Sequence, residues 1–321
     1  MELPRALREA IDKALAGVSA ADLAQASAAL SQRYRSETRD GRLHVANDKA
    51  ALAYLAARMP ATFAAVRAAM DSASELLPDF APKSLLDVGA GPGTALWAAA
   101  DCWPGIADAV LLETSSAMRT WGERLSAHAP VARKVWHSDD VARGIANPSQ
   151  RDLVTLGYVL GELDPKARAP LVERLWSLTV GMLLIVEPGT PAGWTRILEA
   201  RATLVAAGAH LVAPCPHALA CPLEAPDWCH FSRRVTRSRL HRRAKDADVP
   251  WEDEKFIYIA AARAPIVPPQ ARVIAPPKSA SGRVTLKLCR SDGSAGKQLF
   301  SRREGETYKA ARKLDWGDAL T

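Results

Sequence analysis

Apolar positions change their spacing along the chain, and the change predicts where helices and strands lie. In the first 80 residues apolar side chains recur three and four positions apart, as at Leu52, Leu55, Ala56 and Met59, which is typical of helices that bury one face. From residue 84 onward, short apolar runs of the kind found in buried strands alternate with helical stretches. The alternation predicts an α/β fold with a parallel sheet and right-handed crossovers. The expected strands are 84–88, 109–113, a third one shortly before Asp139, then 152–156, 181–187 and 255–263.

Composition divides the chain into three parts. Residues 1–80 are expected to form a helical N-terminal subdomain, and residues 81–264 the α/β domain with a cysteine-rich insertion at 210–232. Prolines cluster just after residue 264, and the rest of the chain combines short strand-like pieces with many basic side chains. We therefore expect 265–321 to be a linker followed by a small C-terminal β extension. A length of 321 residues and an apolar fraction of 48% allow a full hydrophobic core.

The most informative stretch runs from Ser84 to Thr94, where an expected strand meets a glycine turn and a helix. Its three glycines stand at alternate positions, so their spacing differs from the Gly-x-Gly-x-x-Gly of dinucleotide-binding proteins. The pattern Asp-x-Gly-x-Gly-x-Gly resembles motif I of the class I S-adenosylmethionine methyltransferases, which have a Rossmann-like sheet. The alternative is an ordinary tight turn between a strand and a helix. The resemblance implies cofactor binding through Asp87, Gly89, Ala90, Gly91 and Gly93.

Acidic residues follow the next two expected strands. Glu113 ends the second strand, where a carboxylate can accept hydrogen bonds from both ribose hydroxyls of an adenosine. Asp139 and Asp140 come after the third strand, where such folds contact adenine. Because ligands of parallel sheets bind at the carboxyl ends of the strands, we expect these three carboxylates at the cofactor site. Asp139 and Asp140 fit a surface loop equally well.

The segment after the fourth expected strand leaves the catalytic chemistry open. An amine-methylating enzyme of this class often carries Asn/Asp-Pro-Pro-Tyr here, but this chain has Gly-Tyr-Val-Leu from Gly157 onward. A cytosine carbon-5 enzyme needs a cysteine nucleophile, and no cysteine occurs between residues 103 and 214. Tyr158 and Glu162 are the polar candidates for catalysis, and packing or helix-surface roles suit them equally.

Four of the five cysteines are candidate metal ligands, whereas Cys102 lies in an apolar helical stretch and is expected in the core. Cys215, Cys221 and Cys229 follow the spacing C-x5-C-x7-C, and Cys289 comes much later. Proline follows the first two, as in ferredoxin-type loops, and the C-x2-C pairs of zinc ribbons are missing. The spacing also differs from the C-x3-C-x2-C of radical S-adenosylmethionine enzymes. Clustered soft thiolates favour a [4Fe–4S] cluster, with zinc and unliganded thiols as alternatives.

Positive charge gathers in the last third of the chain. Residues 230–321 contain 20 Lys or Arg and 10 Asp or Glu, against 22 and 25 in the residues before them, which gives the net charge of +7. Between Phe231 and Lys245 there are seven basic residues and no acidic one. Such a cluster is typical of nucleic-acid-binding proteins, and a solvated surface helix is the alternative. The candidate RNA-binding residues are Arg233, Arg234, Arg237, Arg239, Arg242 and Arg243.

Nothing in the hydropathy pattern indicates a membrane protein. No apolar run approaches the roughly 20 residues of a membrane-spanning helix. Glu9 and Asp12 come early, unlike the pattern of a secretory signal or a transit peptide. We expect a cytoplasmic bacterial protein that is monomeric and has no membrane partner.

Several segments together resemble one known family, the methyltransferase-like assembly factors of the mitochondrial small ribosomal subunit and their bacterial relatives. The most specific segments are Cys215-Pro-His and Asp227-Trp-Cys-His-Phe, and others are Arg58-Met-Pro-Ala-Thr, Val186-Glu-Pro-Gly-Thr and Tyr308-Lys-Ala-Ala-Arg-Lys. The resemblance implies a class I methyltransferase fold, S-adenosylmethionine binding, and a place on the small ribosomal subunit with 16S-type rRNA as partner. It also implies a [4Fe–4S] cluster held by Cys215, Cys221, Cys229 and Cys289.

Two functions from different classes are compatible with these observations. The first is an iron–sulfur-containing, S-adenosylmethionine-dependent methyltransferase that modifies small-subunit rRNA. The second is a non-catalytic assembly factor that binds this RNA and uses the cofactor and the cluster structurally. The missing catalytic motifs favour the second, whereas the intact glycine motif favours cofactor binding in either. A small-molecule methyltransferase would explain the glycine motif but not the basic last third.

Overall fold

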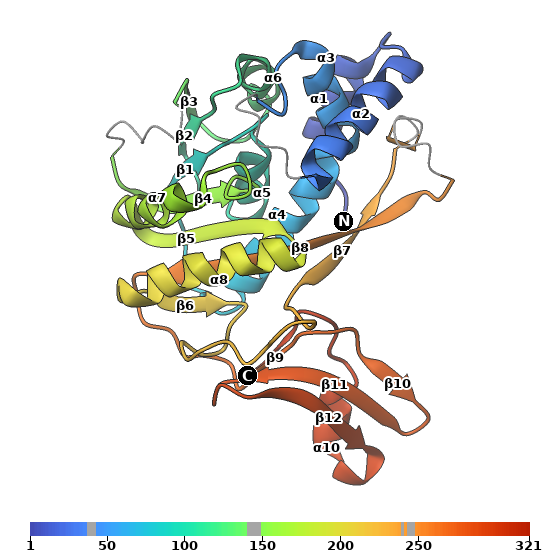
Figure 1. The fold of residues 1–321 in the computed structure, drawn as a ribbon, viewed down its shortest axis with the longest axis vertical. Coiled ribbons are helices and arrows are strands. Elements are labelled where there is room, and N and C mark those ends of the chain that lie inside the picture. Colours follow the sequence, from blue (N-terminus) through green and yellow to red (C-terminus); the bar gives the residue numbers. More distant parts are fainter. Residues whose placement is uncertain (37–42, 140–148, 239–240, 243–247) are drawn as a thin grey trace.

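Two separate β-sheets organise the chain in the computed structural model shown in Figure 1. The structure describes residues 1–36, 43–139, 149–238, 241–242 and 248–321. The larger sheet lies in the middle of the molecule with helices on both of its faces, and the smaller sheet lies at the end formed by the C-terminal part of the chain (Figure 1).

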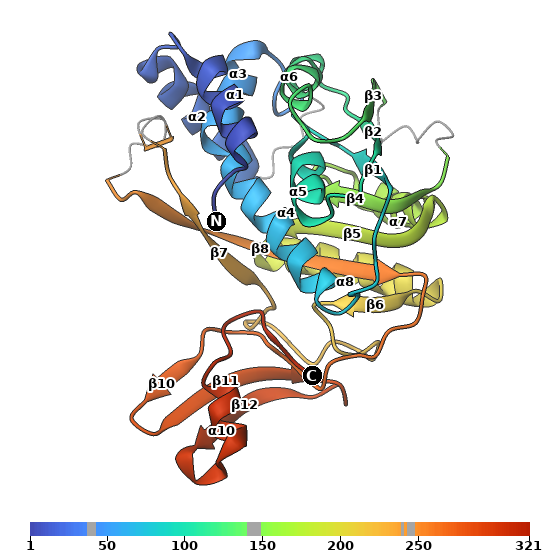
Figure 2. The same ribbon diagram turned by 180° about the vertical axis from the view of Figure 1, so that it is seen from behind.

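Four helices precede the first strand, and the last of them belongs to the core of the molecule. In α4, 11 of the 16 residues are buried, many of them alanines that let neighbouring elements approach closely. Figure 2 shows α4 crossing one face of the large sheet beside α5. Among the described residues no helix is long and apolar enough to cross a membrane. The four helices are α1 (Arg5–Leu15), α2 (Ala20–Arg35), α3 (Asp48–Ala57) and α4 (Met59–Ser74).

The large sheet has the strand order β3-β2-β1-β4-β5-β8-β6, in which β1 lies between β2 and β4. Strands β1 to β5 run parallel to one another, whereas β8 runs antiparallel to its two neighbours, β5 and β6. The bounds are β1 (Ser84–Val88), β2 (Asp108–Leu112), β3 (Arg133–His137), β4 (Arg151–Gly157), β5 (Thr179–Pro188), β6 (His210–Ala213) and β8 (Trp251–Ala262).

Helices that follow the parallel strands cover both faces of this sheet. Helix α5 lies on the same face as α4 (Figure 2), while α7 and α8 cover the opposite face (Figure 1). This coverage explains why β1 and β5 bury consecutive, mostly apolar residues instead of alternating buried and exposed positions. These helices are α5 (Thr94–Cys102), α6 (Ser116–Ser126), α7 (Pro165–Ser177) and α8 (Pro191–Ala206).

Strand β7 (Phe231–Thr236) pairs only with the first half of β8 and forms a two-stranded arm with it. The arm extends beyond the sheet and rises beside the N-terminal helices (Figure 1). The amino group of Met1 donates a hydrogen bond of 2.7 Å to the Arg234 carbonyl, which joins the start of the chain to this arm.

The smaller sheet has its own hydrophobic core, separate from that of the large sheet. Val273, Leu286, Leu288, Phe300 and Tyr308 pack together in it. Its strand order is β10-β11-β9-β13, and β12 pairs with β11. The elements are β9 (Ala271–Val273), β10 (Lys278–Ala280), β11 (Arg283–Arg290), β12 (Ala295–Ser301), the 3-10 helix η1 (Arg302–Glu304), α10 (Glu306–Ala311) and β13 (Ala319–Leu320).

The sequence pattern predicted most of these elements. The alternating strands and helices, the helical N-terminal part and the small C-terminal β extension are all present, so the predicted fold is confirmed. The pattern missed β6 and β7, which are short and flank the cysteines of the segment expected as an insertion. That segment therefore begins and ends in strands of the large sheet.

Candidate functional site

The turn after β1 has the backbone geometry that the glycine pattern predicts. Gly89, Gly91 and Gly93 have φ values of +67°, +55° and +82°, in the left-handed region that residues with a Cβ rarely adopt. A Cβ at position 89 would overlap with the side chain of Val159, just beyond the end of β4. Gly93 is the N-cap of α5, so the first amide groups of that helix lie at the carboxyl edge of the sheet.

Glu113, directly after β2, closes this turn. Its Oε2 accepts a hydrogen bond from the Gly91 amide and its Oε1 accepts one from the Ser115 amide, both at 2.7 Å. The Ala90 amide donates to the Leu112 carbonyl at 3.0 Å, which joins the ends of β1 and β2 a second time. Burial raises the pKa of Glu113, and the hydrogen bonds from the amides oppose that rise. The carboxylate expected at the cofactor site therefore shapes the glycine turn itself.

The other acidic residues predicted for this site lie in different surroundings. Asp87 is 2% exposed and lies inside the sheet, where its Oδ1 accepts a hydrogen bond from Thr155 Oγ1 of β4 at 2.8 Å. Burial raises the pKa of Asp87 to about 7. Asp139 is half-buried, and its carbonyl accepts a hydrogen bond from Thr114 Oγ1 at 2.6 Å. Asp140 lies outside the described residues.

Tyr158, one of the two catalytic candidates, has a φ of +62°, unusual for a residue other than glycine. Its hydroxyl donates a hydrogen bond of 3.1 Å to Glu254 Oε1 on β8. Burial, and then the charge of Glu254, raise the pKa of Tyr158 well above its usual value. The phenol therefore stays protonated near neutral pH and holds the segment after β4 against the β7–β8 arm.

Glu162, the other candidate, lines a pocket at the carboxyl ends of β4 and β5. Three tyrosine rings from α2, α3 and the end of β4 also line it, namely Tyr34, Tyr54 and Tyr158. Burial, and then the charges of Glu113 and Glu187, raise the pKa of Glu162 to about 8. The pocket therefore lies at the same carboxyl edge of the sheet as the glycine turn.

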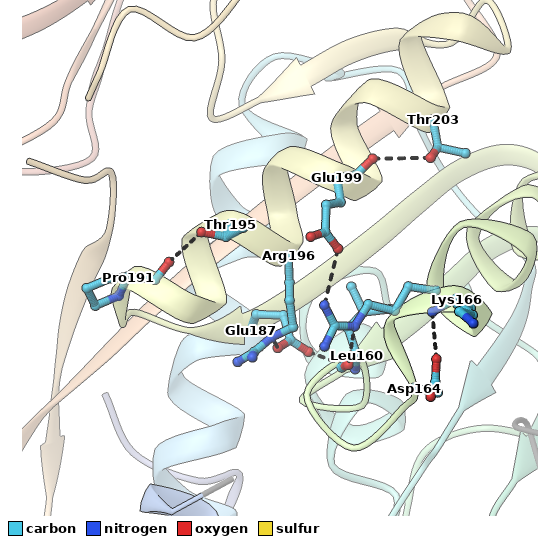
Figure 3. Close-up of polar contacts among 10 residues, drawn as sticks. Leu160, Asp164, Lys166, Glu187, Pro191, Thr195, Arg196, Glu199 and Thr203 are labelled. Atoms are coloured by element: carbon cyan, nitrogen blue, oxygen red, sulfur yellow. Dashed lines mark hydrogen bonds and ion pairs between the residues drawn. The ribbon is translucent and has the colours of Figure 1, made fainter. Parts of the chain in front are cut away.

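Sequence reasoning missed a buried ion pair at this edge of the sheet. Glu187 and Arg196, which are 1% and 4% exposed, form an ion pair of 2.7 Å between the end of β5 and α8 (Figure 3). The Leu160 amide donates to Glu187 Oε1 at 3.0 Å, so the carboxylate joins three elements. Burial raises the pKa of Glu187, and Arg196 opposes that rise. The signal that could have identified Glu187 is an acidic residue directly after the apolar run from Met182 to Val186.

The four cysteines predicted as ligands line one pocket between the two sheets. Cys215, Cys221 and Cys229 come from the segment between β6 and β7, and Cys289 comes from β11. The pKa of Cys289 is raised to about 12 by burial and by the neighbouring thiols Cys215 and Cys221. The Nε2 of His217 lies 3.5 Å from Cys289 Sγ. Cys102 lies elsewhere, in α5.

The arrangement of these side chains does not by itself form a metal site. Among the described residues, no group of three or more His, Cys, Asp or Glu side chains is arranged to hold an ion. The predicted [4Fe–4S] cluster and its zinc alternative therefore stay predictions. The composition of the pocket nevertheless fits a metal–thiolate group of net negative charge. Four thiols and Arg201 line it, the buried Nε of Arg201 has no hydrogen-bond partner among the described residues, and no acidic side chain lines the pocket.

The basic cluster predicted to bind RNA is partly neutralised by β8. Arg234 donates to both oxygens of Asp253, at 2.9 and 3.1 Å, and Arg237 pairs with Glu252 at 2.9 Å. Arg233 and Arg242 are exposed. Arg239 and Arg243 lie outside the described residues.

These features together define a class of protein. The sheet consists of parallel strands with one antiparallel strand, β8, next to its edge. A glycine turn follows β1, and a carboxylate, Glu113, follows β2. This arrangement is that of a class I methyltransferase fold. The chain belongs to the family described as mitochondrial small ribosomal subunit Rsm22, whose model matches residues 48–321. The resemblance inferred from the motifs is thereby confirmed.

Two relatives show how far the similarity extends. The chain is 31% identical over 290 residues to a human protein named ribosome assembly protein METTL17, mitochondrial. The match covers 84% of this chain and 62% of that protein. It is 24% identical over 323 residues to Rsm22-cox11 tandem protein 2, mitochondrial, of Schizosaccharomyces pombe, with coverage of 84% and 43%. The chain thus spans 62% and 43% of the length of these two relatives.

Among solved structures, one similar fold is the magnesium protoporphyrin IX methyltransferase of Synechocystis PCC 6803 with bound S-adenosylmethionine. The identity is 13%, the TM-score is 0.39, and the match covers 73% of this chain and 91% of that one. The fold class rests on the strand order described above and not on this likeness.

The buried Asp87 generates a prediction about stability and pH. Its folded pKa of about 7 lies above the usual value, so the folded chain retains a proton that the unfolded chain releases. Its contribution to stability is therefore present at low pH and is lost as the pH rises toward 7. Replacing it in Asp87→Asn should flatten the pH dependence of the unfolding free energy between about pH 4 and pH 7 by a few kcal/mol, at about 1.4 kcal/mol per pKa unit.

Urea denaturation at several pH values measures this effect. The matched control is Asp79→Asn, which changes an exposed aspartate before β1 and should leave the pH profile as in the unmodified protein. Parallel profiles for Asp87→Asn and the unmodified protein would contradict the prediction.

Proposed function

We propose that this protein is an S-adenosylmethionine-binding assembly factor that binds the rRNA of the small ribosomal subunit. The membership in the Rsm22 family and the name of the human relative, a ribosome assembly protein, support the role in assembly. The observation that supports cofactor binding is the glycine turn after β1. Its three glycines, at alternate positions, all have the left-handed conformation, and Glu113 accepts a hydrogen bond from the middle one.

The carboxylate of Glu113 has acceptor positions left for the hydroxyls of a ribose. Each of its carboxylate oxygens accepts one hydrogen bond from an amide, at 2.7 Å. A carboxylate has about four acceptor positions, so two are available for the ribose hydroxyls of the cofactor. Gly89 and Gly91 would lie beside the amino-acid part of the cofactor, and Asp139 beside its adenine. Asp87, inside the sheet, would support the turn rather than contact the ligand.

Methylation of rRNA is a second candidate function, and one observation favours it. A pocket with three tyrosine rings lies at the same carboxyl edge of the sheet as the glycine turn, and flat aromatic rings can stack on a base that leaves its helix. Against it, the hydroxyl of Tyr158 is engaged with Glu254, and the motif for amine methylation is missing. Mass analysis of small-subunit rRNA from a deletion strain decides between the two functions. If the protein is an rRNA methyltransferase, its deletion leaves one base without its methyl group, whereas deletion of a non-catalytic assembly factor does not.

Cofactor binding is tested with Gly91→Val and Glu113→Ala. The first change places a branched side chain on a backbone with a φ of +55°, and the second removes the ribose acceptor and the bond that shapes the turn. Loss of a charge-assisted hydrogen bond should weaken binding about ten- to hundred-fold. Isothermal titration calorimetry with S-adenosylmethionine measures this.

The matched control for cofactor binding is Glu123→Ala, which removes an exposed glutamate of α6 and should leave the affinity unchanged. Absence of binding to the unmodified protein, or equal affinity in all variants, would rule out this cofactor site.

RNA binding is tested at the two exposed arginines of the basic cluster that the structure describes. The variant Arg233→Gln/Arg242→Gln should lower the affinity for small-subunit rRNA fragments. Each lost phosphate contact should also reduce the slope of log affinity against log salt by about 0.7 to 0.9, the values known for DNA. Arg133→Gln, an exposed arginine of β3, is the control and should leave both quantities as they are. An affinity that does not respond to salt would mean that the cluster is a solvated surface.

We also propose that the four cysteines hold a [4Fe–4S] cluster. A zinc ion needs four sulfurs about 2.3 Å from one point, whereas in a cubane each thiolate binds a different iron. The four thiols line one pocket. The prolines after Cys215 and Cys221 and the missing C-x2-C pairs favour the cubane over zinc. Because Cys289 belongs to β11, such a group would also connect the small sheet to the segment between β6 and β7.

Metal analysis of protein prepared without oxygen tests this proposal. We expect about four irons and four sulfides per chain, and their loss in Cys289→Ser together with faster proteolysis after residue 264. Cys102→Ser is the control, since this thiol lies in α5 and not in the pocket. One zinc ion per chain without iron would mean that the four cysteines hold zinc instead of a [4Fe–4S] cluster. Absence of any metal would falsify the four-cysteine metal site.

A further inference from the structure

Two buried arginines lie beside the four cysteines and come from different parts of the chain. Arg201 belongs to α8 and is 7% exposed, and Arg272 belongs to β9 of the small sheet and is 0% exposed. Arg201 lines the cysteine pocket itself, together with Cys215. Arg272 is the cross-strand partner of Cys289 where β9 pairs with β11.

The hydrogen-bond partners of both arginines are electrically neutral. Nη2 of Arg201 donates to the carbonyls of His217 and Leu219, at 2.8 and 2.6 Å, both within the cysteine segment. In the part of the chain that the structure describes, this guanidinium has no carboxylate within ion-pair distance.

Arg272 makes three bonds of the same neutral kind. Its Nε donates to the Pro214 carbonyl at 3.1 Å, and its Nη1 donates to Ser72 Oγ and to the Gly317 carbonyl at 2.7 and 2.8 Å. These partners lie before Cys215, on α4 and near the C-terminal end. One cationic side chain therefore holds together α4, the cysteine segment and the small sheet.

Each arginine also has an unused donor. Nε of Arg201 and Nη2 of Arg272 are buried and have no partner among the described residues. A buried donor without an acceptor and a buried charge without a counter-charge are both unfavourable, and such groups are normally paired. No acidic side chain lines the pocket that could supply the missing charge.

Binding of a metal changes this balance because it converts the thiols into thiolates. Four thiolates with one zinc ion, or with an oxidised [4Fe–4S] core, carry two net negative charges. Two guanidinium groups next to such a group would bring the local charge to zero. Their unused N–H groups could then donate to sulfur, as donors around metal–thiolate sites commonly do.

We propose that Arg201 and Arg272 are the counter-charges of a doubly negative metal–thiolate group at the four cysteines. This inference rests on the four-cysteine site proposed above. Because Arg272 also holds Ser72 and Gly317, the charge of the site determines how firmly the small sheet is attached to the large one. The arginines are positioning residues, and the pocket selects a group by its charge as well as by its sulfur ligands.

The experiment compares charge-removing and charge-keeping variants in the full chain prepared without oxygen. Arg201→Met and Arg272→Met should release the bound metal to a chelator at roughly 10- to 100-fold lower chelator concentration than the unmodified protein. Arg201→Lys and Arg272→Lys keep the charge and should retain most of the affinity. If Arg272→Met fails to fold, the Arg201 pair of variants decides the question, because this residue lies on a different element.

The matched control is Arg263→Met. Arg263 also donates to two main-chain carbonyls, those of Thr179 and Trp176 at 3.0 and 2.6 Å, but it does not line the cysteine pocket. Its replacement should leave metal retention unchanged. A general loss of stability would lower retention in this control as well, so the comparison separates charge from packing.

A second readout reports the charge of the site directly. If iron is bound, loss of a nearby positive charge disfavours the reduced cluster, so the reduction potential should become more negative in the Met variants and stay close to the original in the Lys variants. In hydrogen exchange, β9 should lose protection when the metal is removed from the unmodified protein.

The outcomes are distinct. Weaker retention in the Met variants, but not in the Lys variants or the control, supports the inference. Metal bound equally well by the Met variants and the unmodified protein overturns the role of the arginines and leaves the four-cysteine site intact. A chain that binds no metal overturns both.

Discussion

The parallel pairing of β1 with β2 and β4 imposes the constraint on which the rest of the structure depends. Parallel strands end at the same edge, so the turn after β1, Glu113 after β2, Tyr158 after β4 and Glu187 at the end of β5 all meet there. The helices on both faces leave this edge as the place where polar groups can collect. The N-terminal helices then lie over it and contribute Tyr34 and Tyr54 to the same pocket.

Burial of charge is the second theme, and the molecule handles it in two ways. At the edge of the large sheet each buried acid has a partner: Arg196 for Glu187, Thr155 for Asp87 and two amides for Glu113. Between the sheets, Arg201 and Arg272 have only neutral acceptors. Each of these acids accepts a hydrogen bond within the chain, although Asp87 Oδ2 has no partner among the described residues. The two arginines lack a counter-charge altogether, and the four cysteines lie beside them.

The two halves of the proposed function are located in different parts of the molecule. The cofactor turn and the tyrosine pocket belong to the large sheet, while the cysteine pocket lies where the small sheet joins it. The basic residues of β7 lie on the arm between these two regions, and acids of β8 neutralise part of their charge. RNA binding would therefore depend on the arginines that remain exposed rather than on the whole cluster.

Local sequence determined the elements whose information lies within a few residues. The run from Ser84 to Thr94 specifies a buried strand, a left-handed glycine turn and a helix, because each feature follows from residues next to one another. The positions of Glu113 and Tyr158 at strand ends followed from the same reasoning. The strands β6 and β7 escaped it, since their short runs bear no clear period and their pairing with β8 supplies the stabilisation.

Only the tertiary structure decided which distant groups meet. Arg272 contacts Ser72, 200 positions away in sequence, and Tyr158 contacts Glu254, 96 positions away. The pairing of Arg234 and Arg237 with acids of β8 reduced the basic cluster for the same reason. The sequence identified the cysteines as a set, but their shared pocket and its two arginines depend on how the small sheet packs against the large one. Such contacts join separate elements, so no local pattern records them.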